Sequence, residues 1–237
     1  MGTQLVLSFA KRYFFNLSNA LNSKHNSQTI RILSPYRNIS LFSFVFILVE
    51  DDLAKAIVQK LLRREKLLNN KLVHILPCGG YTKVIDLAND AITHNLLGKK
   101  ASISIILDGD IQEKAEKYRI KQNIANNIPL NFLPIESLEK YLRNKLVLNV
   151  DHNLFRQLND YIFHNKSLTE LIDTYKNTED TKHDNDGKKL FCIIDKELRE
   201  RRVERSELIN MVVEYLVESQ DCSLKKLTSF LKGQMES

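Results

Sequence analysis

Short apolar runs alternate with helix-period patterns through the middle of the chain. Four runs are brief and almost wholly apolar, as strands buried on both faces are, and they lie at residues 45–49, 73–76, 102–107 and 130–133. A segment with apolar residues at helical spacing follows each run, at about residues 53–62, 84–92, 112–122 and 137–146. Repeated strand–helix units with short connections favour right-handed crossovers. The pattern therefore predicts an α/β fold with a mostly parallel sheet flanked by helices.

The pattern changes near residue 150, where the strand-like runs stop. Apolar residues at helical spacing then predict helices at 154–163, 168–175, 190–201, 206–218 and 223–231, with a polar loop at 176–187. Asp51 or Asp52 is expected to cap the first helix of the α/β part, and Ser206 to cap a late helix. We therefore divide the chain into an N-terminal arm (1–43), an α/β domain (44–148) and an all-helical C-terminal region (149–237).

Two of the expected strands end abruptly in carboxylates. Glu50, Asp51 and Asp52 follow the first strand, and Asp108 and Asp110 follow the third. The carboxyl ends of parallel strands face the crevice in which ligands bind, so these side chains are expected at one edge of the sheet. Clustered acidic oxygens are the ligands that hard divalent cations such as Mg²⁺ prefer. The strand ends thus predict a metal site, and the plainer alternative is a set of solvated loop and N-cap carboxylates.

The remaining strand ends carry further candidates. Gly79 and Gly80 follow the second strand and let the backbone come close to a substrate or a neighbouring strand. Ser137 and Glu139 follow the fourth strand, although a serine at this place is also a common helix cap. Gly109 leaves room for a tight turn between the two aspartates of the third strand end. Carboxylates so arranged can hold one metal and share a ligand with a second, which is how two-metal sites support phosphoryl transfer.

Taken in order, these strand ends resemble the Toprim domain. The shared features are a Glu after the first strand, Gly-Gly after the second and Asp-x-Asp after the third. The segment Leu-Pro-Ile-x-Ser-x-Glu-Lys-Tyr-Leu, which begins at Leu133, resembles the Toprim nucleases named for overcoming a lysogenisation defect (the OLD family). The resemblance covers residues 44–146 well and the helical region only loosely. It implies an endonuclease that cleaves DNA with two divalent metal ions, Mg²⁺ or Mn²⁺.

The resemblance implies roles for individual residues of this sequence. Glu50 and Asp108 would be the central metal ligands and catalytic residues, with Asp110 as a ligand beside them. Ser137 and Glu139 match the Ser-x-Glu pair that adds ligands in the family.

The resemblance also implies a role for one lysine, and this sequence departs from the family pattern at one position. Lys188 or Lys189, with Lys188 preferred, would contact the reacting phosphate. Many Toprim domains carry a second acid four residues after the Glu, where this chain has Ala54. Asp51 is the candidate to replace that missing metal ligand.

The partners implied by the resemblance are DNA and an ATPase. Full-length nucleases of the family carry an ABC-type ATPase ahead of the Toprim domain, and this sequence has no Gly-x-x-x-x-Gly-Lys-Ser/Thr phosphate loop. The ATPase would then act as a separate subunit, or the chain is a shortened relative. The implied setting is anti-phage defence in a bacterium, and a homodimer is also open.

The sequence leaves two other functions open besides a nuclease. The first strand end is similar to that of the receiver domain of two-component signalling, in which Asp108 would accept phosphate and Glu50, Asp51 or Asp52 would hold Mg²⁺. Against it, the third strand ends in two aspartates where a receiver has one Asp and a Pro-containing turn, and the Gly-Gly pair has no receiver role. The other alternative is a non-catalytic Toprim-like module that binds nucleic acid or a protein partner.

Charge and composition add two expectations. The net charge of +6 is uneven, because residues 1–40 contain five basic and no acidic residues. Such an arm could contact phosphate, resemble an organellar transit peptide or form an ordinary surface segment. Three scattered cysteines indicate reduced thiols in a cytoplasmic protein, and no apolar run is long enough to cross a membrane, so no membrane partner is expected.

Overall fold

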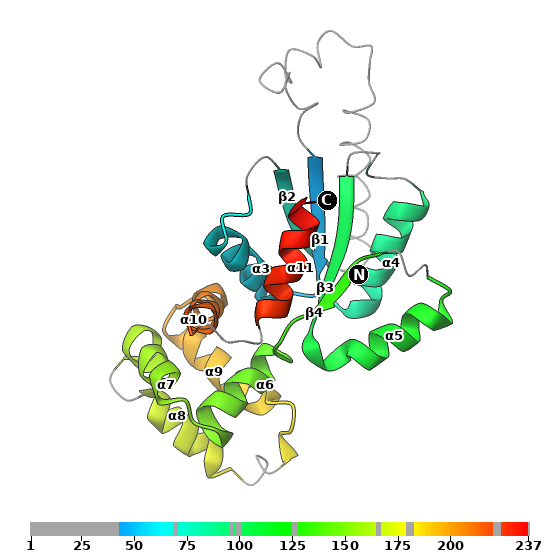
Figure 1. The fold of residues 1–237 in the computed structure, drawn as a ribbon. Coiled ribbons are helices and arrows are strands. Elements are labelled where there is room, and N and C mark those ends of the chain that lie inside the picture. Colours follow the sequence, from blue (N-terminus) through cyan, green and yellow to red (C-terminus); the bar gives the residue numbers. More distant parts are fainter. Residues whose placement is uncertain are drawn as a thin grey trace, which may run out of the picture.

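The structure is a computed structural model and describes residues 43–68, 71–94, 97, 101–124, 128–164, 167–178, 183–219 and 224–236. The expected N-terminal arm, apart from its last residue, lies outside these described residues. Within them the chain forms a four-stranded sheet with helices on both faces (Figure 1). The α/β fold class expected from the sequence is thereby confirmed.

All four strands run parallel, in the order β2-β1-β3-β4. They are β1 (Ser43–Val49), β2 (Lys71–Pro77), β3 (Ala101–Leu107) and β4 (Leu130–Phe132). The end of β1 is level with its neighbours, because Val49 pairs with Pro77 of β2 and with Ile106 of β3. After β2 the chain crosses to the other side of β1 to form β3. Such a reversal is a topological switch point, where open α/β sheets bind their ligands.

The helices agree with the expected segments to within a few residues. In chain order they are α3 (Asp52–Arg64), α4 (Tyr81–Thr93), the short 3-10 segment η3 (Gly109–Ile111), α5 (Gln112–Lys121), α6 (Leu138–Arg143), the π-helical η4 (Asn144–Leu148), α7 (His152–Leu158), the π-helical η5 (Asn159–Phe163), α8 (Ser167–Lys176), α9 (Lys188–Glu200), α10 (Arg205–Glu218) and α11 (Leu224–Glu236). The described residues after β4 therefore form helices and connecting turns without a further strand.

One expected cap is confirmed and another is wrong. Asp51 caps α3, because its side chain accepts a hydrogen bond from the backbone N–H of Ala54 at 2.9 Å. Ser206 does not cap α10. The N-cap is Glu204 instead, in a capping box whose reciprocal partner is Glu207. A glutamate pair therefore satisfies the free N–H groups that the sequence pattern had assigned to a serine.

The central strand β1 is covered on both faces. Phe46 and Leu48 pack among residues of α4 and α5, whereas Val45, Ile47 and Val49 pack on the α3 side, and all five are at most 1% exposed. Fully burying an apolar side chain of this size contributes about 1.5–3 kcal/mol. Double coverage explains why β1 is an unbroken apolar run and not an alternating one.

The C-terminal helices share the core of the α3 face. One cluster of buried residues contains members of β1, of α3 and of every helix from α6 to α11. Figure 1 shows α11 lying along the same face of the sheet as α3, with the group from α6 to α10 beyond the carboxyl ends of the strands. The division between residues 44–148 and 149–237 stays a prediction, and this buried cluster runs across it.

A glycine permits the close approach of two loops at the carboxyl edge. Gly109 donates its backbone N–H to the carbonyl of Ile135 at 3.0 Å, which joins the turn after β3 to the segment after β4. A Cβ at residue 109 would lie 2.6 Å from the carbonyl oxygen of Leu133 and 2.9 Å from that of Ile135. The tight turn expected between Asp108 and Asp110 therefore needs glycine because of its neighbour.

We predict that Gly109→Ala destabilises the protein by about 2 kcal/mol, because overpacking against rigid backbone costs about 1–3 kcal/mol. Gly233→Ala is the matched control, since a Cβ at this position of α11 meets no atom within 4 Å. Removing a glycine from a helix stabilises by about 0.5–1 kcal/mol. Urea denaturation followed by circular dichroism measures both changes. Equal effects of the two substitutions would contradict the close approach at Gly109.

Candidate functional site

Glu50 and Asp108 meet at the switch point between β1 and β3. The backbone N–H of Asp108 donates a hydrogen bond to Oε2 of Glu50 at 3.1 Å. The Glu50 side chain also accepts from the backbone N–H of Tyr81, at the start of α4. Glu50 thus joins the ends of three successive strand units. The structure brings together the two residues that the sequence placed at the centre of the site.

The Gly-Gly pair shapes the start of α4 beside Glu50. Gly79 and Gly80 have φ angles of +75° and +73°, a conformation that residues with a side chain rarely adopt. The backbone N–H of Gly79 donates to the carbonyl of Glu50 at 2.8 Å, which keeps this turn against the end of β1. Glycine is needed here for these φ angles, and the close backbone approach expected from the sequence is not its reason, because a Cβ at either position would meet no atom closer than 4.0 Å.

Asp108 is the most perturbed carboxylate of the site. Its Oδ1 is shielded from solvent and has no hydrogen-bond partner among the described residues. Burial, followed by the negative charges of Asp51, Glu50, Asp110 and Glu139 in that order, raises the pKa of Asp108 to about 8. Five carboxylates therefore lie within electrostatic range of one another at this edge. Burial also raises the pKa of Glu50, against the lowering effect of its hydrogen bond from Asp108.

Asp51 is both a helix cap and a member of the acidic cluster. Its burial, followed by the charges of Glu139 and Asp52, raises its pKa although the hydrogen bond from Ala54 lowers it. The residue as a whole stays exposed, so water and ions reach it from the outer side. The N-cap interpretation of this residue is confirmed, and its role as a metal ligand stays a prediction.

Basic side chains form ion pairs with Asp110 and Glu139, which we call the outer carboxylates. Lys140 contacts Asp110 at 2.8 Å and Glu136 at 3.0 Å, and these partners raise the pKa of the lysine. Glu139 lies 3.6 Å from the guanidinium of Arg205, at the start of α10. Asp110 and Glu139 therefore face the site with a cation beside each of them.

Lys140 and Arg205 were not expected at the site from the sequence. Lys140 carried a weak signal, because it directly follows Glu139 in the Ser-x-Glu-Lys segment and stands four residues after Glu136. Arg205 carried none, since it comes from the helical region and reaches the site only through tertiary packing. Its guanidinium stacks over the ring of Phe191 at 4.5 Å from the ring centre.

Ser137 and Lys188 each have a partner within the fold, and their roles as metal ligand and phosphate contact stay predictions. Ser137 caps α6, and its Oγ accepts a hydrogen bond from the backbone N–H of Lys140 at 3.4 Å. This is the helix-cap role that the sequence also allowed for this serine. Lys188 is the first residue of α9 and forms an exposed ion pair with Asp186 at 3.0 Å. That partner raises the pKa of Lys188, and the charge of Glu139 adds to the effect. Lys188 is therefore brought to the Glu139 side of the site.

A buried network fixes the start of α9. Asp184 is 2% exposed and accepts hydrogen bonds from the backbone N–H groups of Lys189 at 3.1 Å and Leu190 at 3.2 Å. Tyr175 donates its hydroxyl to the same carboxylate at 2.8 Å, and Arg143 contacts that hydroxyl at 3.3 Å. Because these contacts tie α6, α8 and α9 together, Lys188 is held at the edge of the carboxylate cluster by residues that the sequence did not single out.

The donor set suits a hard divalent cation. Among the described residues, no group of three or more His, Cys, Asp or Glu side chains already converges at the spacing of a formed metal site. The carboxylates nonetheless supply only oxygen, and Oδ1 of Asp108 is buried without a partner. Glu50, Asp51 and Asp108 are the residues that could hold such a cation, because oxygen ligands are what Mg²⁺ and Mn²⁺ take.

A cleft of about 460 Å³ opens beside the carboxylates, between α3 and α10. Asp51 and Asp52 line one end of it, and Lys55, Arg205 and Asn210 line its sides. Of the five clustered carboxylates, Asp51 is the one that lines this cleft.

Comparison with known proteins gave no match: no family model, no curated protein and no solved structure is similar to this chain. The resemblance to the Toprim domain therefore rests on the motifs themselves. In the part of the chain that the structure describes, no helix has the length and apolar character needed to cross a membrane.

We predict that the stability of the metal-free protein falls as the pH rises from about 4 to about 8. An aspartate has a pKa of about 3.9 when unfolded, against about 8 for folded Asp108, so the folded state binds more protons in this interval. Asp108→Asn removes this ionisation and should flatten the profile. Glu113→Gln on exposed α5 is the control and should leave it unchanged. Urea denaturation in EDTA across this interval measures the slope, and a variant slope equal to that of the wild type would contradict the prediction.

Proposed function

We propose that this protein is a divalent-metal-dependent endonuclease of Toprim type that hydrolyses phosphodiester bonds in DNA. The observation that carries the proposal is the Glu50–Asp108 pair at the switch point, with an unpartnered Asp108 oxygen inside a cluster of five carboxylates. Keeping such a cluster is unfavourable unless a cation neutralises it. Phosphodiester hydrolysis is the chemistry that carboxylate-held divalent cations support in many enzymes.

Glu50, Asp51 and Asp108 would hold Mg²⁺ or Mn²⁺, and Asp110, Ser137 and Glu139 are the further ligands that the resemblance implies. Bound ions supply Lewis acidity and lower the pKa of water in such sites. The protein's own contribution is to position the ligands. The N–H of Asp108 holds the Glu50 carboxylate at 3.1 Å, and the turn at Gly109 places Asp108 and Asp110 around one tight bend.

The cations around the cluster are suited to a phosphate. Lys188 is exposed in the first turn of α9, where the helix dipole also attracts negative charge. In the proposed mechanism Lys188 neutralises charge on the reacting phosphate. Arg205 and Lys140 pair with Glu139 and Asp110 and add positive charge beside the site.

The biological setting follows from the same resemblance. We place the protein in the cytoplasm of a bacterium, in anti-phage defence, with an ABC-type ATPase acting in trans. A homodimer would bring two such sites to a duplex.

A phosphoacceptor role is the second candidate, and the strand order favours it in one respect. The order β2-β1-β3-β4 is that of the first four strands of flavodoxin-like sheets, and Asp108 directly follows β3. Against it, the described chain after β4 continues in helices, with no fifth strand on the sheet. A non-catalytic module that binds nucleic acid or a partner is the remaining candidate.

We predict that the purified protein nicks supercoiled plasmid in Mg²⁺ or Mn²⁺. Glu50→Gln and Asp108→Asn should each slow nicking by about 100-fold or more, because even indirect support of metal ligands is worth about 10–100-fold. Glu113→Gln, which removes an exposed carboxylate of α5, should leave the rate unchanged. Gel electrophoresis of the plasmid over time measures the rates.

Equal nicking by the wild type and Asp108→Asn would exclude Asp108 from the reaction. Labelling of Asp108 by acetyl phosphate in a protein that does not nick DNA would replace the nuclease by the phosphoacceptor. A wild type that neither nicks nor is labelled, with and without ATPase partners, would leave only the binding module.

A further inference from the structure

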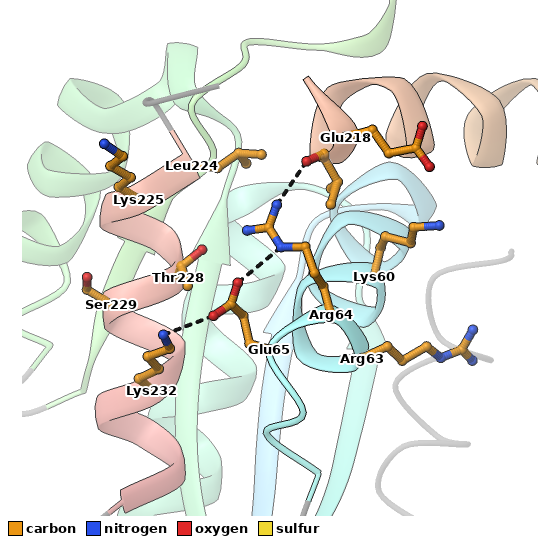
Figure 2. A pocket seen from close by; sticks show the side chains of 11 residues that line it. Lys60, Arg63, Arg64, Glu65, Glu218, Leu224, Lys225, Thr228, Ser229 and Lys232 are labelled. Atoms are coloured by element: carbon orange, nitrogen blue, oxygen red, sulfur yellow. Dashed lines mark hydrogen bonds and ion pairs between the residues drawn. The ribbon is translucent and has the colours of Figure 1, made fainter. Parts of the chain in front are cut away.

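A second and larger groove lies at the other end of α3 from the carboxylates. It measures about 1160 Å³ and is formed by the C-terminal turns of α3 and α10 together with the exposed face of α11 (Figure 2). Five basic residues and two acidic ones line it: Lys60, Arg63, Arg64, Lys225, Lys232, Glu65 and Glu218. We call this surface the basic groove. It presents more positive charge than its own acids neutralise.

Some of the charged residues of the basic groove pair with one another and hold its three helices together. Glu65 bridges Arg64 at 3.0 Å and Lys232 at 2.9 Å, and these hydrogen bonds, that of Lys232 first, lower its pKa. Arg64 also donates to the carbonyl of Val217 at 2.8 Å, which ties α3 to the last turn of α10. Lys60 pairs with Glu214 at 2.6 Å. The three helices are thus joined by charged contacts around the groove.

Two cations of the basic groove remain available. Arg63 and Lys225 are exposed, and neither forms an ion pair with another described residue. Figure 2 shows them on different helices, Arg63 on α3 and Lys225 on α11. Ser229 adds a hydroxyl group to the α11 wall. Free cations and a hydroxyl along a concave surface are the usual ligands of phosphate groups.

The position of the basic groove connects it with the carboxylate site. α3 begins at the Asp51 cap and ends at Arg64 in the groove, and its 13 residues span about 18 Å. α10 runs alongside in the same sense, from Arg205 beside Glu139 to Glu218 in the groove. The 460 Å³ cleft next to Asp51 opens between the same two helices. One helix pair therefore carries an acidic site at its start and a basic groove at its end.

We propose that the basic groove binds the phosphate backbone of the same DNA whose scissile bond lies at the carboxylates. The separation of about 18 Å corresponds to about five phosphates along one strand of a duplex. This inference rests on the proposed nuclease function and deepens it, because it names a substrate-binding surface that the Toprim-like motifs do not contain. The groove positions DNA by its charge and reads no sequence.

The chemistry of the basic groove favours nucleic acid over a membrane surface. Surfaces that bind anionic lipid combine cations with exposed apolar side chains that enter the bilayer. The large apolar side chains that are exposed in the described chain lie elsewhere, and none of them lines the groove. A concave and cationic surface without exposed large apolar side chains matches a phosphate backbone better than it matches a flat bilayer.

The test removes two charges from the basic groove and two from elsewhere. Arg63→Gln/Lys225→Gln is the groove variant. Lys121→Gln/Lys226→Gln is the matched control, since Lys121 ends α5 and Lys226 lies outside the groove although it neighbours Lys225. All four side chains are exposed, so both variants should fold. Fluorescence anisotropy with a labelled DNA duplex in EDTA, over a range of salt, measures binding without cleavage.

The groove variant should bind about tenfold or more weakly, and its slope of log K against log salt should shrink by about 1.8, which is two lost phosphate contacts. At DNA concentrations below saturation its nicking rate should fall together with its affinity. The control should keep the wild-type slope. If both variants bind and cleave like the wild type, the groove inference is overturned and the nuclease proposal stands.

Other outcomes separate the two proposals. Groove-dependent binding by a wild type that cleaves no DNA with Mg²⁺ or Mn²⁺ would support the groove and overturn the nuclease. A wild type that binds no DNA would overturn both. Tighter groove-dependent binding to phosphatidylserine vesicles than to DNA would overturn the assignment to nucleic acid.

Discussion

Repulsion among the carboxylates at the ends of β1 and β3 is the constraint around which this edge of the molecule is arranged. Because β1 and β3 pair in parallel and end at the same level, Glu50 and Asp108 lie next to each other. Backbone hydrogen bonds offset part of this repulsion. The N–H groups of Asp108 and Tyr81 donate to the Glu50 carboxylate, and the N–H of Ala54 donates to that of Asp51. None of these donors reaches Oδ1 of Asp108. The divalent cation that we propose for this site would supply the missing charge to these oxygen atoms.

The helical region completes this edge in a way that a four-stranded sheet alone would not. α10 packs along α3 and brings Arg205 to Glu139, and the network around Asp184 holds the start of α9 against α6. Both contacts depend on one buried cluster that extends from β1 to α11. The acidic site and the basic groove are consequently two ends of one packed unit, which makes joint use of both by an extended polyanion physically reasonable.

Much of the fold could be predicted because local signals agreed with tertiary structure. The unbroken apolar run of β1 indicated a strand covered on both sides, and Asp51 before a helical pattern indicated a cap; both are found. The predicted cap at Ser206 was wrong because Glu204 is the N-cap and pairs reciprocally with Glu207, an arrangement that a preference for serine caps does not reveal. Glu50 and Asp108 were expected at one edge because both follow strands of a parallel sheet, and the structure shows in addition that those two strands are neighbours. The positions of Arg205, Asp184 and the basic groove were not, because they depend on which faces of the C-terminal helices pack together.

We propose that Glu50 and Asp108 jointly hold a divalent cation. A crystal structure grown with Mn²⁺ tests this most directly, because anomalous scattering locates the metal independently of any activity. We expect a Mn²⁺ peak in contact with carboxylate oxygens of both residues, including Oδ1 of Asp108. Mn²⁺ bound only elsewhere, with Glu50 still accepting from the N–H of Asp108 and Oδ1 still without a ligand, would contradict it.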